Sequence, residues 1–153
     1  MRHLELFAGI GGFRRAMDLL TQDHIMNFHC VGYSEIDPKA VKTYCANYRP
    51  EQDEEVAMGD IVEFTKNPEN IENLPDFDLI TGGFPCQTFS MMGKQAGVNE
   101  DRGQMFFRII DILAARRPRY VLLENVKNLR NHDQGRTYNR INEELELLGY
   151  RVF

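Results

Sequence analysis

The chain has 153 residues, of which 42% are hydrophobic and 27% charged, and its formal net charge is -5. This composition is ordinary for one globular domain with a sizeable core, and it excludes a disordered chain. No apolar run is long enough to span a bilayer and no signal-peptide core follows Met1, so we expect a cytoplasmic protein without a membrane partner. The acidic balance also lacks the overall positive charge that usually supports affinity for nucleic acid.

The first predicted unit is a strand over residues 3–7, a glycine turn over 8–12 and then a helix. Strand, glycine turn and helix in this order are typical of nucleotide-binding sites, although the dinucleotide pattern Gly-x-Gly-x-x-Gly fails at Arg14. The alternative is a tight turn that binds nothing. The helix is indicated by apolar residues at helical spacing, namely Phe13, Ala16, Met17 and Leu20.

The second unit is a strand over 29–34 and a helix with Asp37 as its N-cap and Pro38 at its first position. Glu35 lies between the two elements, 24 residues after Gly11. An acid roughly 20 residues past a glycine turn can accept hydrogen bonds from both hydroxyls of a ribose. The alternative is a solvated carboxylate at the end of a strand.

A third strand is predicted over 56–61, and after a surface loop over 65–75 a buried strand follows over 77–81. Asp60 is suited to bond the amino group of an adenine, with Ile61 packed on the ring. The alternative is that Asp60 is only a turn residue.

Residues 82–90 read Gly-Gly-Phe-Pro-Cys-Gln-Thr-Phe-Ser and begin a loop where this buried strand ends. Ligands bind beyond the carboxyl ends of strands in open α/β sheets, so Cys86, on a loop stiffened by Pro85, is a candidate nucleophile. The alternative is a small buried hydrophobe, which is our expectation for Cys45 on the apolar stripe of the second helix. The three cysteines include no Cys-x-x-Cys pair, so we expect no disulfide framework and no metal.

After residues 90–101, which we interpret as a functional loop, a helix is predicted over 106–113 and a buried strand over 120–123. That strand presents Glu124 and Asn125 at the same sheet edge as the cysteine loop. A last helix over 138–148, with Gly149 as its cap, and a strand over 150–153 complete the chain. Six predicted strands alternating with four helices favour a doubly wound, mainly parallel α/β sheet.

Six motifs in this order are highly specific as a set. Together they resemble the DNA (cytosine-5)-methyltransferases, in particular the catalytic domain of bacterial modification methylases. The resemblance implies a Rossmann-like S-adenosylmethionine-dependent fold, with 1–153 as a partial catalytic domain that is incomplete at its C-terminal edge. The motifs are Phe7–Gly12, Glu35–Pro38, Gly59–Ile61, Gly82–Ser90, Asp101–Gly103 and Glu124–Val126.

The resemblance further implies S-adenosylmethionine as cofactor and cytosine in DNA as target. Glu35 would hold the ribose, and Asp60 and Ile61 the adenine. Ile36 stands where the family often has tryptophan, which leaves apolar contact with the adenine in place of aromatic stacking. The remaining cofactor-binding positions would be Phe7, Gly9, Gly11, Phe84 and Met105.

The chemistry explains why the family needs these residue types. A stacked cytosine is out of reach, so the base must be flipped into a pocket, where a thiolate adds to carbon 6 and activates carbon 5. Cys86 fits the nucleophile, and Glu124, held protonated by burial, fits the acid that bonds ring nitrogen 3 and the exocyclic amine. A strand-end ion pair is the alternative for Glu124. The substrate-binding positions would be Pro85, Gln87, Ser90, Lys94, Gln95 and Arg102, with Asn125 orienting the loop; a solvated charged loop is their alternative.

Three family features do not follow within this sequence: a Gln-x-Arg-x-Arg stretch, a target-recognition domain and a C-terminal segment that returns to the cofactor domain. We therefore expect DNA as partner, together with a complementary C-terminal polypeptide or a second copy. The competing hypotheses are a half enzyme that binds S-adenosylmethionine without transferring methyl, and an RNA cytosine methyltransferase. Phe-Pro-Cys-Gln, rather than Pro-Pro-Cys-Gln, disfavours the RNA enzyme.

Overall fold

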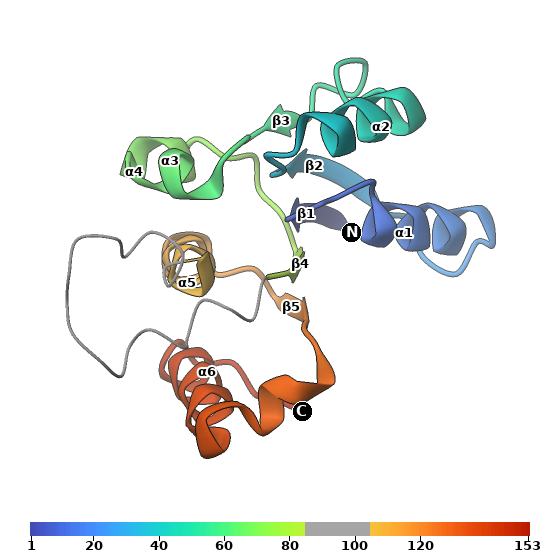
Figure 1. Cartoon of the computed structure of the whole chain (residues 1–153). Coiled ribbons are helices and arrows are strands. Elements are labelled where there is room, and N and C mark those ends of the chain that lie inside the picture. Colours follow the sequence, from blue (N-terminus) through green and yellow to red (C-terminus); the bar gives the residue numbers. More distant parts are fainter. Residues whose placement is uncertain (85–104) are drawn as a thin grey trace.

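The computed structural model describes residues 1–84 and 105–153. Within these residues, five strands form one sheet in the order β3-β2-β1-β4-β5, and every neighbouring pair is parallel (Figure 1). The predicted doubly wound parallel α/β fold is confirmed. The strands are β1 (Arg2–Leu6), β2 (His29–Tyr33), β3 (Val56–Ala57), β4 (Leu79–Gly83) and β5 (Tyr120–Glu124).

Helices cover both faces of the sheet, with α1 and α2 on one side and α3 to α6 on the other (Figure 1). The chain therefore leaves β1 on one side for β2 and returns to β4 on the other, which makes the carboxyl ends of β1 and β4 the topological switch point. The helices are α1 (Gly12–Gln22), α2 (Pro38–Tyr48), α3 (Ile61–Thr65), α4 (Pro68–Glu72), α5 (Met105–Arg116) and α6 (Arg136–Leu147), with short 3-10 turns η2 (Lys127–Arg130) and η3 (His132–Gly135).

The two faces of the sheet carry different cores. On the α5 side the core is large, continuous and mostly aliphatic, and Leu4 and Leu6 of β1 contribute to it. On the α1 and α2 side a smaller aromatic cluster includes Tyr33 stacked on Tyr44 at a ring distance of 4.3 Å. Because β1 is covered on both faces, its four inner residues are all buried.

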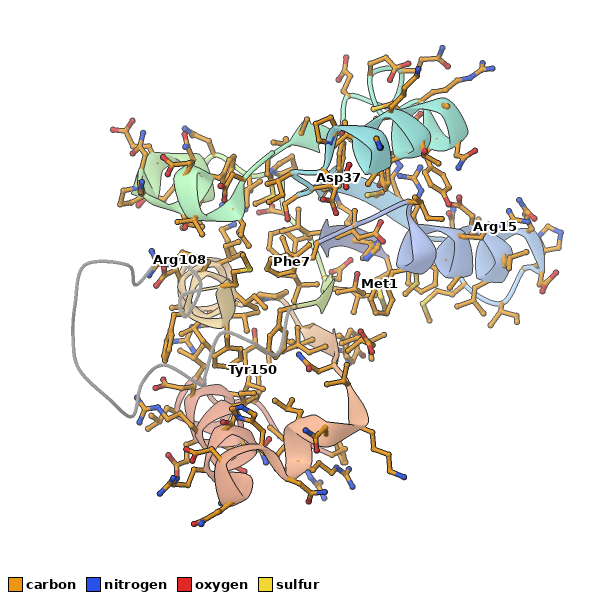
Figure 2. The ribbon with its side chains drawn as sticks, in the orientation of Figure 1. Met1, Phe7, Arg15, Asp37, Arg108 and Tyr150 are labelled. Atoms are coloured by element: carbon orange, nitrogen blue, oxygen red, sulfur yellow. The ribbon has the colours of Figure 1, made fainter. Side chains whose placement is uncertain are left out.

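The start of α2 agrees with the prediction. The side chain of Asp37 accepts hydrogen bonds from the amides of Lys39 and Ala40, at 2.7 and 3.3 Å, and Pro38 is the first helical residue. In Figure 2, Asp37 marks this helix start and Phe7 the end of β1. Cys45 is only half-buried, so its predicted place in the core is wrong, because on this helix only Tyr44 is buried.

The predicted strand over 56–61 was too long. β3 ends at Ala57 because Gly59 has a φ of +61°, which breaks the extended backbone, and Asp60 then caps α3. The predicted loop over 65–75 contains α4, which begins where the side chain of Asn67 accepts a hydrogen bond from the amide of Glu69 at 3.1 Å.

Two expectations at the other end of the sheet were also wrong. β5 is not a buried strand, because it is the edge strand and Tyr120 and Leu122 are 42% and 47% exposed. Residues 150–153 form no strand, because within the described residues β5 pairs only with β4. In residues 1–84 and 105–153, no helix has the length and apolar character of a membrane span, and no three metal-ligating side chains gather.

Candidate active site

The glycine turn after β1 is held against the end of β2. Phe7 and Gly9 have φ values of +54° and +57°, which turn the chain sharply out of the strand. The Phe7 amide donates to the hydroxyl of Ser34 at 3.1 Å, and the Ala8 amide donates to the Ser34 carbonyl at 2.8 Å. The carboxyl ends of β1 and β2 are thereby joined beside the switch point of the sheet.

Glu35 is fixed by three backbone amides. Its Oε2 accepts from Gly9 at 2.7 Å, and its Oε1 accepts from Ile36 and Asp37 at 2.8 Å each. A carboxylate offers about four acceptor positions, so the oxygen that bonds Gly9 keeps acceptor capacity for a ligand. The carboxylate is thus preorganised, and the Gly9 amide is the link between it and the glycine turn.

A small hollow of about 40 Å³ lies beside this carboxylate. It is far smaller than a complete small-molecule site, so it accommodates the edge of a ligand rather than all of it. Six of the nine predicted cofactor-binding residues line it, together with Ser34 and Gly59. The six are Phe7, Glu35, Ile36, Asp60, Ile61 and Met105.

The residues around the hollow offer both apolar contact and hydrogen bonding. Ile36 is 62% exposed, which is unusual for a large apolar side chain and leaves it free to contact a ligand. Ile61 is buried at the start of α3, directly after Asp60. The Oδ1 of Asp60 accepts from the Val62 amide at 2.8 Å, so this acid caps the helix as well as lining the hollow.

Three predicted cofactor residues lie outside the hollow. Gly9 contributes through its amide, as described above. Gly11 packs instead against α2, where its carbonyl accepts from the Tyr48 hydroxyl at 2.8 Å. Phe84 is buried against Phe106, with their ring centroids 5.6 Å apart.

The carboxyl ends of β4 and β5 meet beside the turn. Gly83 pairs with Glu124, and a β-carbon placed on Gly83 would lie 3.0 Å from the Oε2 of Glu124. The side chain of Asn125 donates to the Phe84 carbonyl at 2.6 Å, next to Pro85, where the cysteine loop begins. Glu124 is exposed in this structure, so the burial expected to hold it protonated is not present.

The cysteine loop lies outside the described residues. That part of the chain contains Pro85, Cys86, Gln87, Ser90, Lys94, Gln95 and Arg102.

Some residues at this edge were missed by the motif analysis. Ser34 is buried and bonds the turn through both its hydroxyl and its carbonyl. Its position directly before Glu35, at the end of a strand, could have indicated that it belongs to the site. Gly59 lines the hollow and has a positive φ. It belongs to the motif Gly59-Asp60-Ile61, but the motif assigned no role to it.

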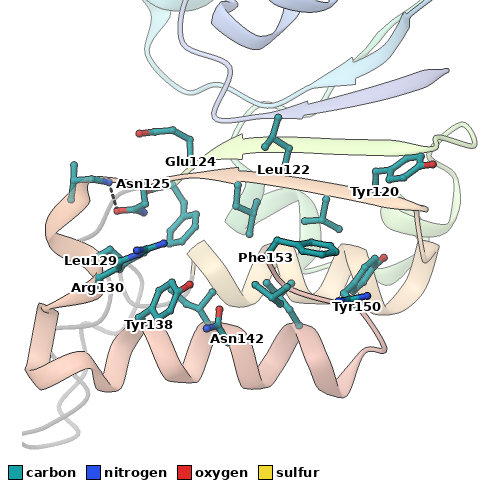
Figure 3. A pocket seen from close by; sticks show the side chains of 18 of the residues that line it. Tyr120, Leu122, Glu124, Asn125, Leu129, Arg130, Tyr138, Asn142, Tyr150 and Phe153 are labelled. Atoms are coloured by element: carbon teal, nitrogen blue, oxygen red, sulfur yellow. Dashed lines mark hydrogen bonds between the residues drawn. The ribbon is translucent and has the colours of Figure 1, made fainter. Parts of the chain in front are cut away.

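A larger groove of about 900 Å³ lies along β5, α6 and the residues that follow α6. Figure 3 shows Arg130 and Tyr138 at one end of it and Tyr150 at the other. Phe153, also in its lining, is 96% exposed. The groove therefore presents apolar surface at the open edge of the sheet.

Comparison with known proteins gives the family. The sequence matches the family described as C-5 cytosine-specific DNA methylase over residues 1–153. It is 41% identical to the orphan methyltransferase M.Rho11sI of Bacillus phage rho11s, over 99% of this chain and 28% of that protein. It is 42% identical to the type II methyltransferase M.BanI of Aneurinibacillus aneurinilyticus, over 99% of this chain and 33% of that protein.

A third relative is the type II methyltransferase M.NlaX of Neisseria lactamica, which is 42% identical over 98% of this chain and 44% of its own length. The chain thus spans less than half of each of these relatives. The family match nevertheless covers all 153 residues, so this chain belongs to the C-5 cytosine-specific DNA methylases.

Proposed function

We propose that this chain is the cofactor-binding catalytic part of an enzyme that methylates carbon 5 of cytosine in DNA, within a restriction-modification system. The observation that carries the proposal is the Glu35 carboxylate, which three amides fix beside a hollow at the carboxyl ends of β1, β2 and β3. Family membership supports the reaction. Because the relatives named above come from bacteria and a bacterial phage, whose DNA lies in the bacterial cytoplasm, the proposed place of action is the cytoplasm.

The residues around the hollow fit S-adenosylmethionine. The Glu35 oxygen that bonds Gly9 has acceptor capacity for a ribose hydroxyl. Ile36 and Ile61 offer apolar surface to the adenine, and Asp60 offers a carboxylate to its amino group. When bound, S-adenosylmethionine supplies an electrophilic methyl group for carbon 5 of the base.

Cys86 and Glu124 are the proposed catalytic residues. The Cys86 thiolate adds to carbon 6 of a flipped cytosine, and the electron pair moves to carbon 5. Glu124, as a carboxylic acid, bonds ring nitrogen 3 and offsets the negative charge. After methylation, loss of the proton on carbon 5 expels the thiolate and restores the double bond.

Glu124 needs a change of surroundings for this role. It is exposed in the free chain. A base flipped against the ends of β4 and β5 would cover it and favour its protonated form. Asn125 is proposed to orient the cysteine loop through the Phe84 carbonyl.

The test of the cofactor site is calorimetric titration of the chain with S-adenosylmethionine. Glu35→Gln should weaken binding by about 1 to 3 kcal/mol, the usual loss for charged hydrogen bonds. Glu143→Gln is the matched control, because it removes an exposed carboxylate on α6. Equal affinity of the wild-type and Glu35→Gln chains would reject the ribose role.

We further propose that methyl transfer requires a C-terminal polypeptide equivalent to the part of the relatives that this chain does not span. The exposed edge strand β5 and the groove beside it favour such a partner, because unpaired apolar edges invite pairing. The test is transfer of tritiated methyl to unmethylated DNA by the chain alone and with the C-terminal part of M.NlaX. Transfer by the chain alone would reject the requirement.

The nucleophile is tested in the same mixture of this chain with the C-terminal part of M.NlaX. The wild-type chain should form a covalent adduct with DNA that carries 5-fluorocytosine, and Cys86→Ser should not. Adducts that persist in the variant would remove Cys86 as nucleophile.

A further inference from the structure

Glu5 is a buried carboxylate that the proposed reaction does not use. It lies in the central strand β1 with an exposed fraction of 0%, on the face covered by α1 and α2. Its Oε1 accepts from the backbone amide of Arg14 at 3.2 Å, and its Oε2 accepts from the Tyr44 hydroxyl at 3.4 Å. The Arg14 amide belongs to α1, which follows the glycine turn, and Tyr44 belongs to α2, which packs against the turn at Gly11.

The bond to Arg14 compensates for a missing helix cap. Helix α1 begins after Gly11, which has a left-handed backbone and no side chain to bond the first-turn amides. Such amides need an acceptor, and a negative charge near them is favourable. Glu5 supplies that acceptor from the neighbouring strand, so the helix start is fixed to β1 across the turn.

Tyr48 holds the same turn from the other side. Its hydroxyl donates to the Gly11 carbonyl at 2.8 Å, and a β-carbon at Gly11 would lie only 2.2 Å from the ring. The Arg14 guanidinium lies 5.3 Å from the centre of the Tyr48 ring and forms an ion pair with the buried Glu55. The glycine turn is thus held by Glu5 of β1 on one side and by Tyr48 of α2 on the other.

Keeping a carboxylate at this position has a cost. Burial raises the pKa of Glu5 from 4.5 to about 7, against the opposing effect of the Arg14 amide and charge. Buried charged networks are weak contributors to stability, since apolar replacements of similar volume are often as stable. Glu5 is therefore better explained by the conformation that it specifies than by the free energy of folding.

That conformation leads directly to the cofactor hollow. The turn between Glu5 and Arg14 carries Phe7, which lines the hollow, and Gly9, whose amide bonds Glu35 at 2.7 Å. We propose that Glu5 and Tyr48 are positioning residues for the methyl donor: they fix the glycine turn so that the Gly9 amide holds the Glu35 carboxylate toward the ligand. This inference rests on the proposed function, because it assumes that S-adenosylmethionine binds in the hollow.

The experiment is calorimetric titration of the full chain with S-adenosylmethionine. Glu5→Ala removes both acceptors and should weaken binding about tenfold, and Tyr48→Phe should weaken it about threefold, because each loosens the turn. Glu5→Gln should restore most of the affinity, since its amide oxygen still accepts from Arg14. A role limited to overall stability predicts wild-type affinity in all three variants at temperatures where they are folded.

Thr81→Val is the matched control. Thr81 lies beside Glu5 on β4 and is equally buried, and its side chain bonds the Nε2 of His3 at 2.7 Å rather than a residue of the turn. It should lower Tm and leave the affinity unchanged. Equal weakening by Thr81→Val and Glu5→Ala would overturn the inference.

Two further outcomes separate this inference from the proposed function. If Glu35→Gln binds as well as the wild type, the proposed cofactor site fails. If Glu35→Gln binds weakly while Glu5→Ala and Tyr48→Phe bind normally, only the positioning role fails. Should Glu5→Ala not fold, Tyr48→Phe decides the question, and wild-type affinity in that variant overturns the inference.

Discussion

Two buried titratable residues of β1 give the unfolding free energy opposite dependences on pH. Burial raises the pKa of Glu5 from 4.5 to about 7. Burial also lowers the pKa of His3 from 6.5 to about 4, and the positive charge of Arg14 lowers it further. The titratable groups packed around this pair are Arg14 of α1, Tyr44 and Tyr48 of α2, Cys30 of β2, and Glu55 before β3.

The sign for each residue follows from its folded-state pKa. Glu5 stabilises the fold fully below pH 4.5, and this contribution is lost as the pH rises through about 7. At roughly 1.36 kcal/mol per pH unit, the interval corresponds to about 3 kcal/mol. His3 contributes fully above pH 6.5 and loses a similar amount, about 3 kcal/mol, as the pH falls through about 4. In the wild type the two dependences nearly cancel.

Removing either residue should therefore reveal the other. His3→Gln should lose about 3 kcal/mol of unfolding free energy as the pH rises from 4.5 to 7, because only Glu5 then titrates. Glu5→Gln should lose about 3 kcal/mol as the pH falls from 6.5 to 4, because only His3 then titrates. Subtracting the wild-type curve removes every group that both proteins share, including the surface carboxylates, and leaves the contribution of the residue that was replaced.

The assay is urea denaturation followed by circular dichroism at a series of pH values. A carbon-13 titration of the Glu5 carboxyl, with its midpoint near pH 7, provides an independent check. If both variants run parallel to the wild type, the two residues keep ordinary pKa values and the reasoning is refuted. Slopes of the same sign in both variants would refute it equally.

Three other substitutions test the structure, and the first two are each compared with a milder substitution. Gly11→Ala should cost at least about 2 kcal/mol in urea denaturation, because φ is +91° and Tyr48 fills the space, whereas Gly9→Ala, with nothing within 4 Å, should cost about 1 kcal/mol. Glu55→Gln breaks the buried pair with Arg14 and should cost about 3 kcal/mol, whereas Glu63→Gln at an exposed pair should cost less than about 1 kcal/mol; equal losses would contradict the burial of the first pair. Asn125→Ala should reduce methyl transfer by the complemented enzyme about tenfold without weakening S-adenosylmethionine binding, and a change in binding alone would contradict a role at the cysteine loop.

The parts predicted correctly from sequence are those fixed by local chemistry. Asp37 and Pro38 define the start of α2, because the cap involves only residues up to three positions further along the chain. The spacing from Gly11 to Glu35 corresponds to one turn, one helix and one strand. The sequence did not predict how short β3 is, or that residues 150–153 form no strand, because a strand exists only where a neighbouring strand pairs with it. The positive φ of Gly59 and the helix cap at Asn67 are local features. They were not predicted because glycine and asparagine each adopt more than one common conformation.

The role of Glu5 was hidden for a different reason. The alternation His3-Leu4-Glu5-Leu6 is typical of a strand with one face in water. The sheet order instead makes β1 central, and helices cover both of its faces, so the polar residues of that pattern are enclosed. Once enclosed, a carboxylate must find donors, and those within reach include the Arg14 amide at the start of α1 and the Tyr44 hydroxyl. A polar alternation in the central strand of a doubly wound sheet therefore indicates residues that fix the adjoining turn, and in this chain that turn forms the candidate cofactor site.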